Sequence, residues 1–209
     1  MRKVILPALA TIFIIAASAF TLNPGIEIGQ KAPSTDYKMM GVDGKAQTLE
    51  GLKKENGLLV IFSCNTCPFV VGREGASAGW EGRYNQLFDI SQSMGVGMVL
   101  VNSNEAKRGG DDSLDAMRKH AKDNGYKMPY VVDTNSELAN AFDARTTPHV
   151  YLFNGAMELV YKGAIDDNVD DATQVKENYL QDAIRKMTTG RPIDTPETKA
   201  LGCSIKRVS

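Results

Sequence analysis

The apolar run from Leu58 to Ser63, which has the pattern of a buried strand, leads directly into two cysteines. These are Cys64 and Cys67, and Pro68 follows where a helix is expected to begin. The spacing lets the two sulfurs bond with little backbone movement, and the helix N-terminus is expected to stabilise a thiolate on the first cysteine. The pattern favours reversible disulfide chemistry at the end of a strand.

A cysteine pair at this spacing is also half of a zinc site. Zinc needs two further ligands, and the remaining candidates are Cys203, His120 and His149. None of these three stands at ligand spacing from another. The sequence therefore favours the redox interpretation and predicts neither a metal nor a cofactor.

Residues 1–19 have the pattern of a secretory signal peptide. Met1 to Lys3 is basic, Val4 to Ala16 is almost wholly apolar, and Ala17 to Ala19 supplies the small-x-small pattern that a signal peptidase recognises. A retained, outward-facing membrane anchor is the alternative, but the apolar stretch is shorter than the roughly 20 residues of a spanning helix. We expect an exported chain that begins near Phe20 and acts outside the cytoplasm, in the periplasm, where disulfides persist.

Residues 20–209 are expected to form one domain, because about 190 residues hold one full core and are too few for two. The net charge is −1 with both signs interspersed, which argues against nucleic acid as a partner. Three cysteines are an odd number for an exported chain. One thiol must therefore stay free, pair with another molecule, or exchange with the other two.

Apolar periodicity and turn residues predict alternating strands and helices. Short strands flank a turn at Val42 to Lys45, and a glycine-rich break at Gly72 to Gly79 follows the cysteines. Further strands are expected at 58–63, 97–101, 130–132, 149–153 and 159–162, and helices at 49–55, 80–94, 113–124, 136–142 and 173–187. This order predicts an α/β fold with a central mixed sheet and helices on both faces.

Two motifs at the right separation resemble the thioredoxin fold. They are the strand that ends in the cysteine pair, and Thr146-Thr147-Pro148 just before a strand and hairpin. The resemblance implies a three-layer fold in which the Thr147–Pro148 bond is cis and Pro148 lies against the cysteines. It also implies a substrate site at Thr147, Pro148 and Pro68, where the backbone of Thr147 pairs with a partner peptide like an added strand.

A narrower resemblance is to the alkyl-hydroperoxide-reductase/thiol-specific-antioxidant superfamily. Gly29 to Leu52 is similar to its N-terminal extension, here expected as a β-hairpin. Within the superfamily, Cys-Asn-x-Cys-Pro, Gly163 to Asp167 and Gly202 to Lys206 resemble a peroxiredoxin-like subgroup of thioredoxin-family proteins.

The chain departs from both patterns at two positions. Peroxiredoxins carry Pro-x-x-x-Thr-x-x-Cys, but Ile61 stands three residues before Cys64, and Cys64 itself stands three before Cys67. The peroxide-binding threonine is therefore absent. Thioredoxin has a buried aspartate where this chain has Leu58, so an acid–base helper would come from elsewhere, such as the region of Glu74 or a water.

The resemblance implies thiol–disulfide exchange, with Cys64 as the exposed attacking thiolate and Cys67 as the buried resolving thiol. The expected partners are disulfide- or dithiol-bearing proteins and a redox partner protein, and a membrane only if the N-terminal segment is retained. Two alternatives stay open. One is a peroxiredoxin-like thiol peroxidase, and the other is a non-catalytic binding module with a structural disulfide.

The remaining polar candidates are given structural roles. His149 is expected as a strand-edge residue, with a catalytic role near the cysteines as the alternative, and His120 as a surface residue. Trp80 and Tyr84 are expected in the core or at its rim. The acidic run is expected to be a solvated turn that caps the last helix rather than a calcium loop, and its members are Asp166, Asp167, Asp170 and Asp171.

The third cysteine has two readings, a small apolar residue of the C-terminal tail or a second resolving thiol. Leu201, Cys203 and Ile205 alternate as in an extended segment with one apolar face. We expect Cys203 to lie too far from the pair to bridge directly and to anchor the tail.

Overall fold

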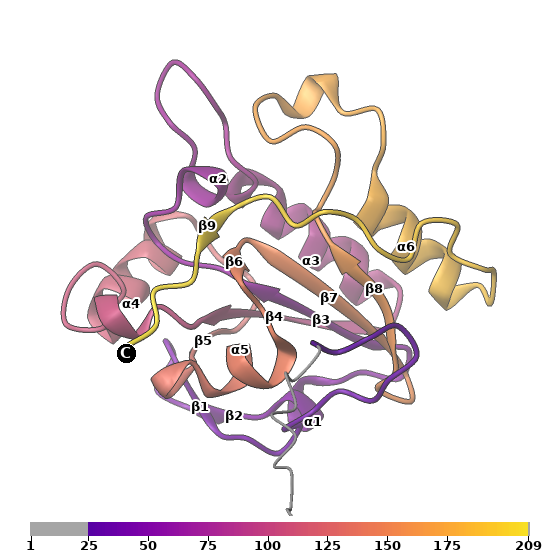
Figure 1. Ribbon diagram of the computed structural model, residues 1–209, viewed down its shortest axis with the longest axis horizontal. Coiled ribbons are helices and arrows are strands. Elements are labelled where there is room, and N and C mark those ends of the chain that lie inside the picture. Colours follow the sequence, from indigo (N-terminus) through magenta and orange to yellow (C-terminus); the bar gives the residue numbers. More distant parts are fainter. Residues whose placement is uncertain (1–24, 209) are drawn as a thin grey trace, which may run out of the picture.

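The computed structural model describes residues 25–208 and shows an α/β fold built around a mixed sheet (Figure 1). The expected signal peptide, residues 1–19, and the expected start near Phe20 lie outside the described residues. Between residues 25 and 208, no helix combines the length and the apolar character needed to cross a membrane.

Seven of the strands form two hydrogen-bonded sets that meet at β3 and β4. One set has the order β2-β1-β5-β4 and the other β3-β7-β8. Beyond the end of β3, the N–H of Ser63 donates to the carbonyl oxygen of Val101 on β4 at 2.8 Å. β4 and β5 are parallel, whereas β1–β2, β1–β5, β3–β7 and β7–β8 are antiparallel, so the sheet is mixed as predicted. Their bounds are β1 (Met39–Gly41), β2 (Ala46–Gln47), β3 (Gly57–Phe62), β4 (Val96–Asn102), β5 (Tyr130–Val132), β7 (His149–Asn154) and β8 (Leu159–Gly163).

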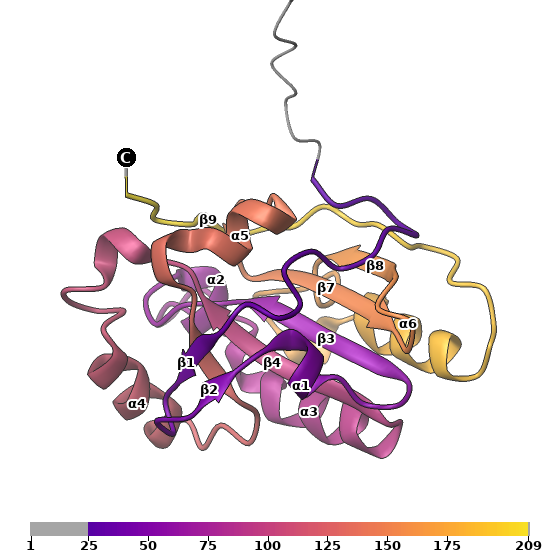
Figure 2. The ribbon, with the colours of Figure 1, turned by 90° about the horizontal axis from the view of Figure 1, so that it is seen from below.

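Helices cover both faces of this sheet, and β3 shows why. All of its side chains are buried. Leu59 and Ile61 belong to the apolar cluster on one face, and Leu58, Val60 and Phe62 to the cluster on the other. The first cluster includes residues of α2 (Pro68–Val71), α3 (Tyr84–Ser93), α4 (Leu114–Asp123) and α6 (Tyr179–Thr188). The second includes residues of α1 (Leu49–Leu52) and α5 (Glu137–Phe142). Figure 2 shows α3 and α5 on opposite sides of the strands.

Local signals place several helix boundaries where the sequence predicts them. The Ser113 hydroxyl accepts from the N–H of Ala116 at 3.2 Å and caps α4. The helix after the cysteines, α2, is a single turn that stops at Gly72, whose φ is +82°. A Cβ there would lie 2.7 Å from the carbonyl oxygen of Ser77, so the predicted break is confirmed and requires glycine.

Two helix starts differ from the predicted ones. The last helix begins at Tyr179, not at residue 173, because the preceding residues form a separate 3₁₀ turn, Ala172–Gln174, and acidic side chains bind the backbone of this segment. Asp171 accepts from the N–H of Thr173 at 2.8 Å, and Asp167 accepts from that of Lys176 at 3.0 Å. The helix predicted from residue 80 starts as a 3₁₀ turn, Glu81–Arg83, before α3.

Candidate active site

Cys64 and Cys67 lie between the end of β3 and the start of α2, as the sequence predicts. Both are free thiols, and only 2% of Cys64 and 3% of Cys67 are exposed. The expectation of an exposed first cysteine is therefore wrong. Cys67 is the N-cap of α2, and Pro68 is its first residue, where the fixed φ of proline suits a helix start.

Thr147 lies between the two sulfurs. Its hydroxyl is 3.2 Å from Sγ of Cys64, and the Cys67 thiol donates to its carbonyl oxygen at 3.0 Å. The peptide bond from Thr147 to Pro148 is cis, as the resemblance implies. Contacts from one residue to both sulfurs keep the pair at the same end of the sheet as the cis proline.

The C-terminal tail folds back over this site. β6 (Thr146–Thr147) pairs antiparallel with β9 (Cys203–Ser204), and Cys203 stands opposite Thr147. Cys203 packs against the apolar cluster that contains Cys64 and Cys67, and its thiol is close enough to Cys67 to affect the pKa of both groups. β9 thus brings Cys203 beside the pair, whereas the sequence analysis expects it to lie too far away to bridge.

The tail only partly matches the predicted apolar face. Ile205 is 5% exposed and packs into the core, whereas Leu201 is 42% exposed. The backbone of Thr147, expected to be free for a partner peptide, is already paired with the chain's own tail at Cys203.

The three thiols hold their protons with unequal strength. The pKa of Cys67 is lowered to about 5, chiefly by the hydrogen bond from the Cys64 thiol. Burial opposes this shift, while the Cys203 thiol and the backbone N–H groups of Cys203 and Phe69 support it. The pKa of Cys64 is raised by the same hydrogen bond and by burial. Burial raises the pKa of Cys203 to about 11, and its contact with Cys67 adds to this.

The directions of these shifts favour the thiolate on Cys67, whereas the sequence analysis expects it on Cys64. An ionised Cys67 gives up the hydrogen bond that its thiol donates to the Thr147 carbonyl. The main cause of the lowered pKa is the hydrogen bond from the Cys64 thiol, and the start of α2 adds a smaller contribution. This helix starts one residue after Cys67, so the N–H of Phe69 is directed at the second sulfur. The nearby carboxylate of Asp112 acts in the same direction, because it adds to the raised pKa of Cys64.

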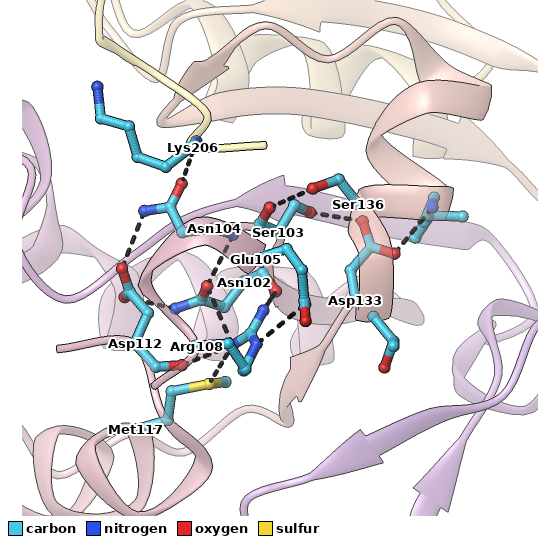
Figure 3. A network of polar contacts seen from close by, with 12 residues as sticks. Asn102, Ser103, Asn104, Glu105, Arg108, Asp112, Met117, Asp133, Ser136 and Lys206 are labelled. Carbon is cyan, nitrogen blue, oxygen red and sulfur yellow. Dashed lines mark hydrogen bonds and ion pairs between the residues drawn. The ribbon is translucent and has the colours of Figure 1, made fainter. Parts of the chain in front are cut away.

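Asp112 is a buried carboxylate beside the site that the sequence analysis missed (Figure 3). It accepts hydrogen bonds from the backbone N–H of Asn65 at 3.0 Å, from Nδ2 of Asn102 at 2.7 Å and from Nδ2 of Asn104 at 3.0 Å. Nothing in the local sequence distinguishes Asp112 from the exposed Asp111 before it. Its role comes from the end of β4, which supplies the amide of Asn102, and from the residues just after it, which supply that of Asn104.

The other histidine and carboxylate candidates lie apart from this arrangement. Nδ1 of His149 contacts the hydroxyl of Tyr151 at 3.3 Å, and burial lowers the pKa of His149 to about 4. His120, expected on the surface, is half-buried and contacts the Glu81 carboxylate through Nε2. Glu74, suggested as a helper, lies in the exposed loop after α2.

The acidic run is a structural element, but its first member is not solvated. Asp166 is 5% exposed, pairs with the guanidinium of Arg83 and accepts from Nε1 of Trp80 at 2.9 Å. Trp80 and Tyr84 are both buried, as predicted. Among the described residues, no group of histidine, cysteine and carboxylate side chains is arranged to hold a metal ion.

Comparison with known proteins places the chain in a family. Residues 27–178 match the Redoxin family model. The thiol-disulfide oxidoreductase ResA of Geobacillus thermodenitrificans (strain NG80-2) is 25% identical over 175 residues, which cover 79% of this chain and 87% of that protein. A crystal structure of an uncharacterized conserved protein from Geobacillus kaustophilus has a TM-score of 0.76 and 31% identity, covering 87% of this chain and 92% of that one.

A more distant solved structure shares the fold alone. It is a putative protein disulfide isomerase from Bacteroides thetaiotaomicron, with a TM-score of 0.55 and 16% identity over 78% of this chain and 91% of that one. The fold predicted from the sequence, a thioredoxin-like arrangement of a mixed sheet between helices, is confirmed. Because the family model spans most of the described residues, the chain belongs to the Redoxin family.

Proposed function

We propose that this protein is a thiol–disulfide oxidoreductase and that Cys64 and Cys67 are its redox pair. The observation that carries the proposal is the position of both thiols against Thr147, beside the cis bond to Pro148. The similarity to a relative named as a thiol-disulfide oxidoreductase supports the same chemistry.

The reaction is a two-electron exchange whose direction depends on the relative reduction potentials of the pair and its partner. In the direction of substrate reduction, two electrons pass from the dithiol to a substrate disulfide. The Cys67 thiolate attacks one substrate sulfur, forms a mixed disulfide and expels the other substrate sulfur as a thiolate. Cys64 then loses its proton and attacks Sγ of Cys67, and the second substrate sulfur leaves as a thiolate. The pair ends as a disulfide, the substrate as a dithiol, and a dithiol partner protein reduces the pair again.

The low pKa of Cys67 affects the equilibrium more than the rate. Lowering a thiol pKa from 9.0 to about 5 raises the thiolate fraction at neutral pH by about 100-fold. Over the same range of pKa, the intrinsic nucleophilicity of the thiolate falls by roughly 60-fold, at a Brønsted slope of about 0.45. The net gain in attack is about twofold, so the larger effect is on the equilibrium: a stabilised thiolate favours the reduced pair and makes it a weaker reductant than an unshifted pair.

The site residues and the compartment complete the proposal. Thr147 and Pro148, with Pro68 at the start of α2, form the surface on which a disulfide-bearing or dithiol-bearing protein docks. The basic and apolar segment at residues 1–19 supports export to the periplasm. N-terminal sequencing of protein isolated from that compartment tests export, and a chain that still begins at Met1 in the cytoplasm contradicts it.

The decisive experiment follows reduction of a model protein disulfide with dithiothreitol as electron source. Cys67→Ser should abolish turnover and Cys64→Ser should lower it strongly. Met40→Ala, at an exposed position on β1, should leave it unchanged. Circular dichroism confirms that each variant is folded.

Two further measurements separate the alternative functions. Consumption of hydrogen peroxide at a rate above that of disulfide reduction would favour a thiol peroxidase. A reduction potential below about −300 mV, together with absent turnover, would favour a structural disulfide in a binding module.

A further inference from the structure

Cys67 has a thiol neighbour on each side. Cys64 follows the end of β3, Cys203 lies on β9, and both pack in the same cluster as Cys67 and affect its pKa. The carbonyl oxygen of Thr147, 3.0 Å from Sγ of Cys67, belongs to the residue that pairs with Cys203 across β6 and β9. The second cysteine is therefore the central sulfur of a three-thiol cluster.

The position of Cys203 is held from both sides along the tail. A Cβ on Gly202 would lie 2.3 Å from the carbonyl oxygen of Thr147, so only glycine allows β9 to approach this closely. After Cys203, the N–H of Ile205 donates to the carbonyl of Arg145 at 2.9 Å.

The next residue connects the tail to the polar network of Figure 3. The N–H of Lys206 donates to Oδ1 of Asn104 at 2.8 Å, and its carbonyl accepts from the N–H of Ala106 at 2.8 Å. Asn104 also donates to Asp112, which binds the backbone of Asn65 next to Cys64. One network therefore positions both the first cysteine and the tail that carries the third.

We propose that Cys203 is a third redox-active thiol of this site and forms a disulfide with Cys67 in exchange with the Cys64–Cys67 disulfide. The inference rests on the proposed function and adds a second resolving thiol to it. No residue other than Cys67 is shared between the two disulfides.

The exchange between the two disulfides needs no external oxidant or reductant. Cys203 loses its proton and attacks Sγ of Cys67, so that the Cys67–Cys203 bond forms and the Cys64–Cys67 bond breaks. Cys64 leaves as a thiolate and takes up the proton that Cys203 released, and no electron enters or leaves. In a mixed disulfide on Cys67, the same attack by Cys203 expels the substrate sulfur. The Cys67–Cys203 bond also holds β9 on β6, the position expected for a partner peptide.

Disulfide mapping in three folded single variants of the full chain tests the proposal. Cys64→Ser and Cys203→Ser each keep Cys67 with one neighbour, whereas Cys67→Ser keeps the two outer thiols and is the matched control. Each reduced variant is oxidised with diamide at low protein concentration, quenched in acid, alkylated and digested with trypsin. A bond from the pair to the tail links peptides 55–73 and 200–206, whereas a Cys64–Cys67 bond stays within the first peptide.

We expect monomeric Cys64→Ser to give the linked peptides at a rate independent of protein concentration. Cys203→Ser should give only the bond within peptide 55–73. The linked product should fall by roughly tenfold or more in Cys67→Ser, which lacks the sulfur that the two disulfides share. In the disulfide-reduction assay, Cys64→Ser should keep residual turnover that Cys64→Ser/Cys203→Ser loses.

Folded Cys64→Ser without the linked peptides would overturn the proposal, as would equal linkage in Cys67→Ser. These outcomes are separate from a failure of the proposed function, which would appear as absent turnover in the unaltered protein. The mapping does not depend on turnover, so each proposal can fail alone.

Discussion

Thr147 and Cys203 face each other across the short antiparallel pair of β6 and β9. This pairing closes the site from the side of the cis proline, and it explains why both cysteines of the pair are almost fully buried. In this closed arrangement, β9 occupies the backbone edge of Thr147 at which the proposed partner would dock. The same contact makes Cys67, rather than Cys64, the sulfur with most hydrogen-bond donors around it.

The first prediction concerns the order of thiol reactivity. In the reduced protein, iodoacetamide at about pH 6 should modify Cys67 before Cys64, because the pKa of Cys67 is lowered to about 5 and most of this thiol is ionised. The rate should fall as the pH drops through about 5. Cys203 is an internal control, since it is more exposed but its pKa is raised to about 11. Faster labelling of Cys64, mapped by peptide mass spectrometry, would contradict the assignment.

The second prediction concerns the buried carboxylate beside the pair. Asp112→Asn replaces one acceptor oxygen by an NH₂ group, which then faces an amide or N–H donor, such as that of Asn65, Asn102 or Asn104. We expect a loss of about 1–3 kcal/mol in the free energy of unfolding, measured in urea. The matched control is Asp111→Asn at the exposed neighbouring position, which should change stability by less than about 0.5 kcal/mol. Equal effects of the two substitutions would show that the buried network does not stabilise the fold.

The third prediction concerns the ion pair between the acidic run and the helix that follows the glycine-rich loop. Asp166→Asn leaves the guanidinium of Arg83 without its buried counter-charge, so we expect a loss of about 3 kcal/mol in thermal or urea unfolding. Asp170→Asn, in the exposed part of the same run, is the control and should be nearly neutral. A neutral Asp166→Asn would mean that this segment is solvated, as the sequence alone suggested.

The fourth prediction is a pH dependence caused by His149. Its pKa is lowered from 6.5 to about 4 by burial, so the unfolded chain binds the proton more readily than the folded one. Stability should therefore fall as the pH drops from 6.5 to about 4, by at most about 3 kcal/mol from this group. His149→Gln should remove this part of the slope, whereas His120→Gln should keep it. A slope unchanged by His149→Gln would contradict the prediction.

The sequence by itself determined the elements of this fold and the location of its chemistry. The strand before Cys64, the break at Gly72, the cap at Ser113 and the alternating order of strands and helices all depend on neighbouring residues, whose preferences are readable locally. The cis bond before Pro148 came from the family resemblance, because the residue types alone do not distinguish the two isomers.

Only the tertiary structure decided the pKa shifts of the three thiols and which side chains surround them. Cys203 meets Cys67 because a tail strand pairs with β6, and Asp112 meets the backbone beside Cys64 because β4 ends nearby. The pairing of Asp166 with Arg83 likewise joins two distant segments. Such contacts leave no periodic trace in the sequence, since each depends on where separate elements come together, and burial then sets the pKa of the groups that meet.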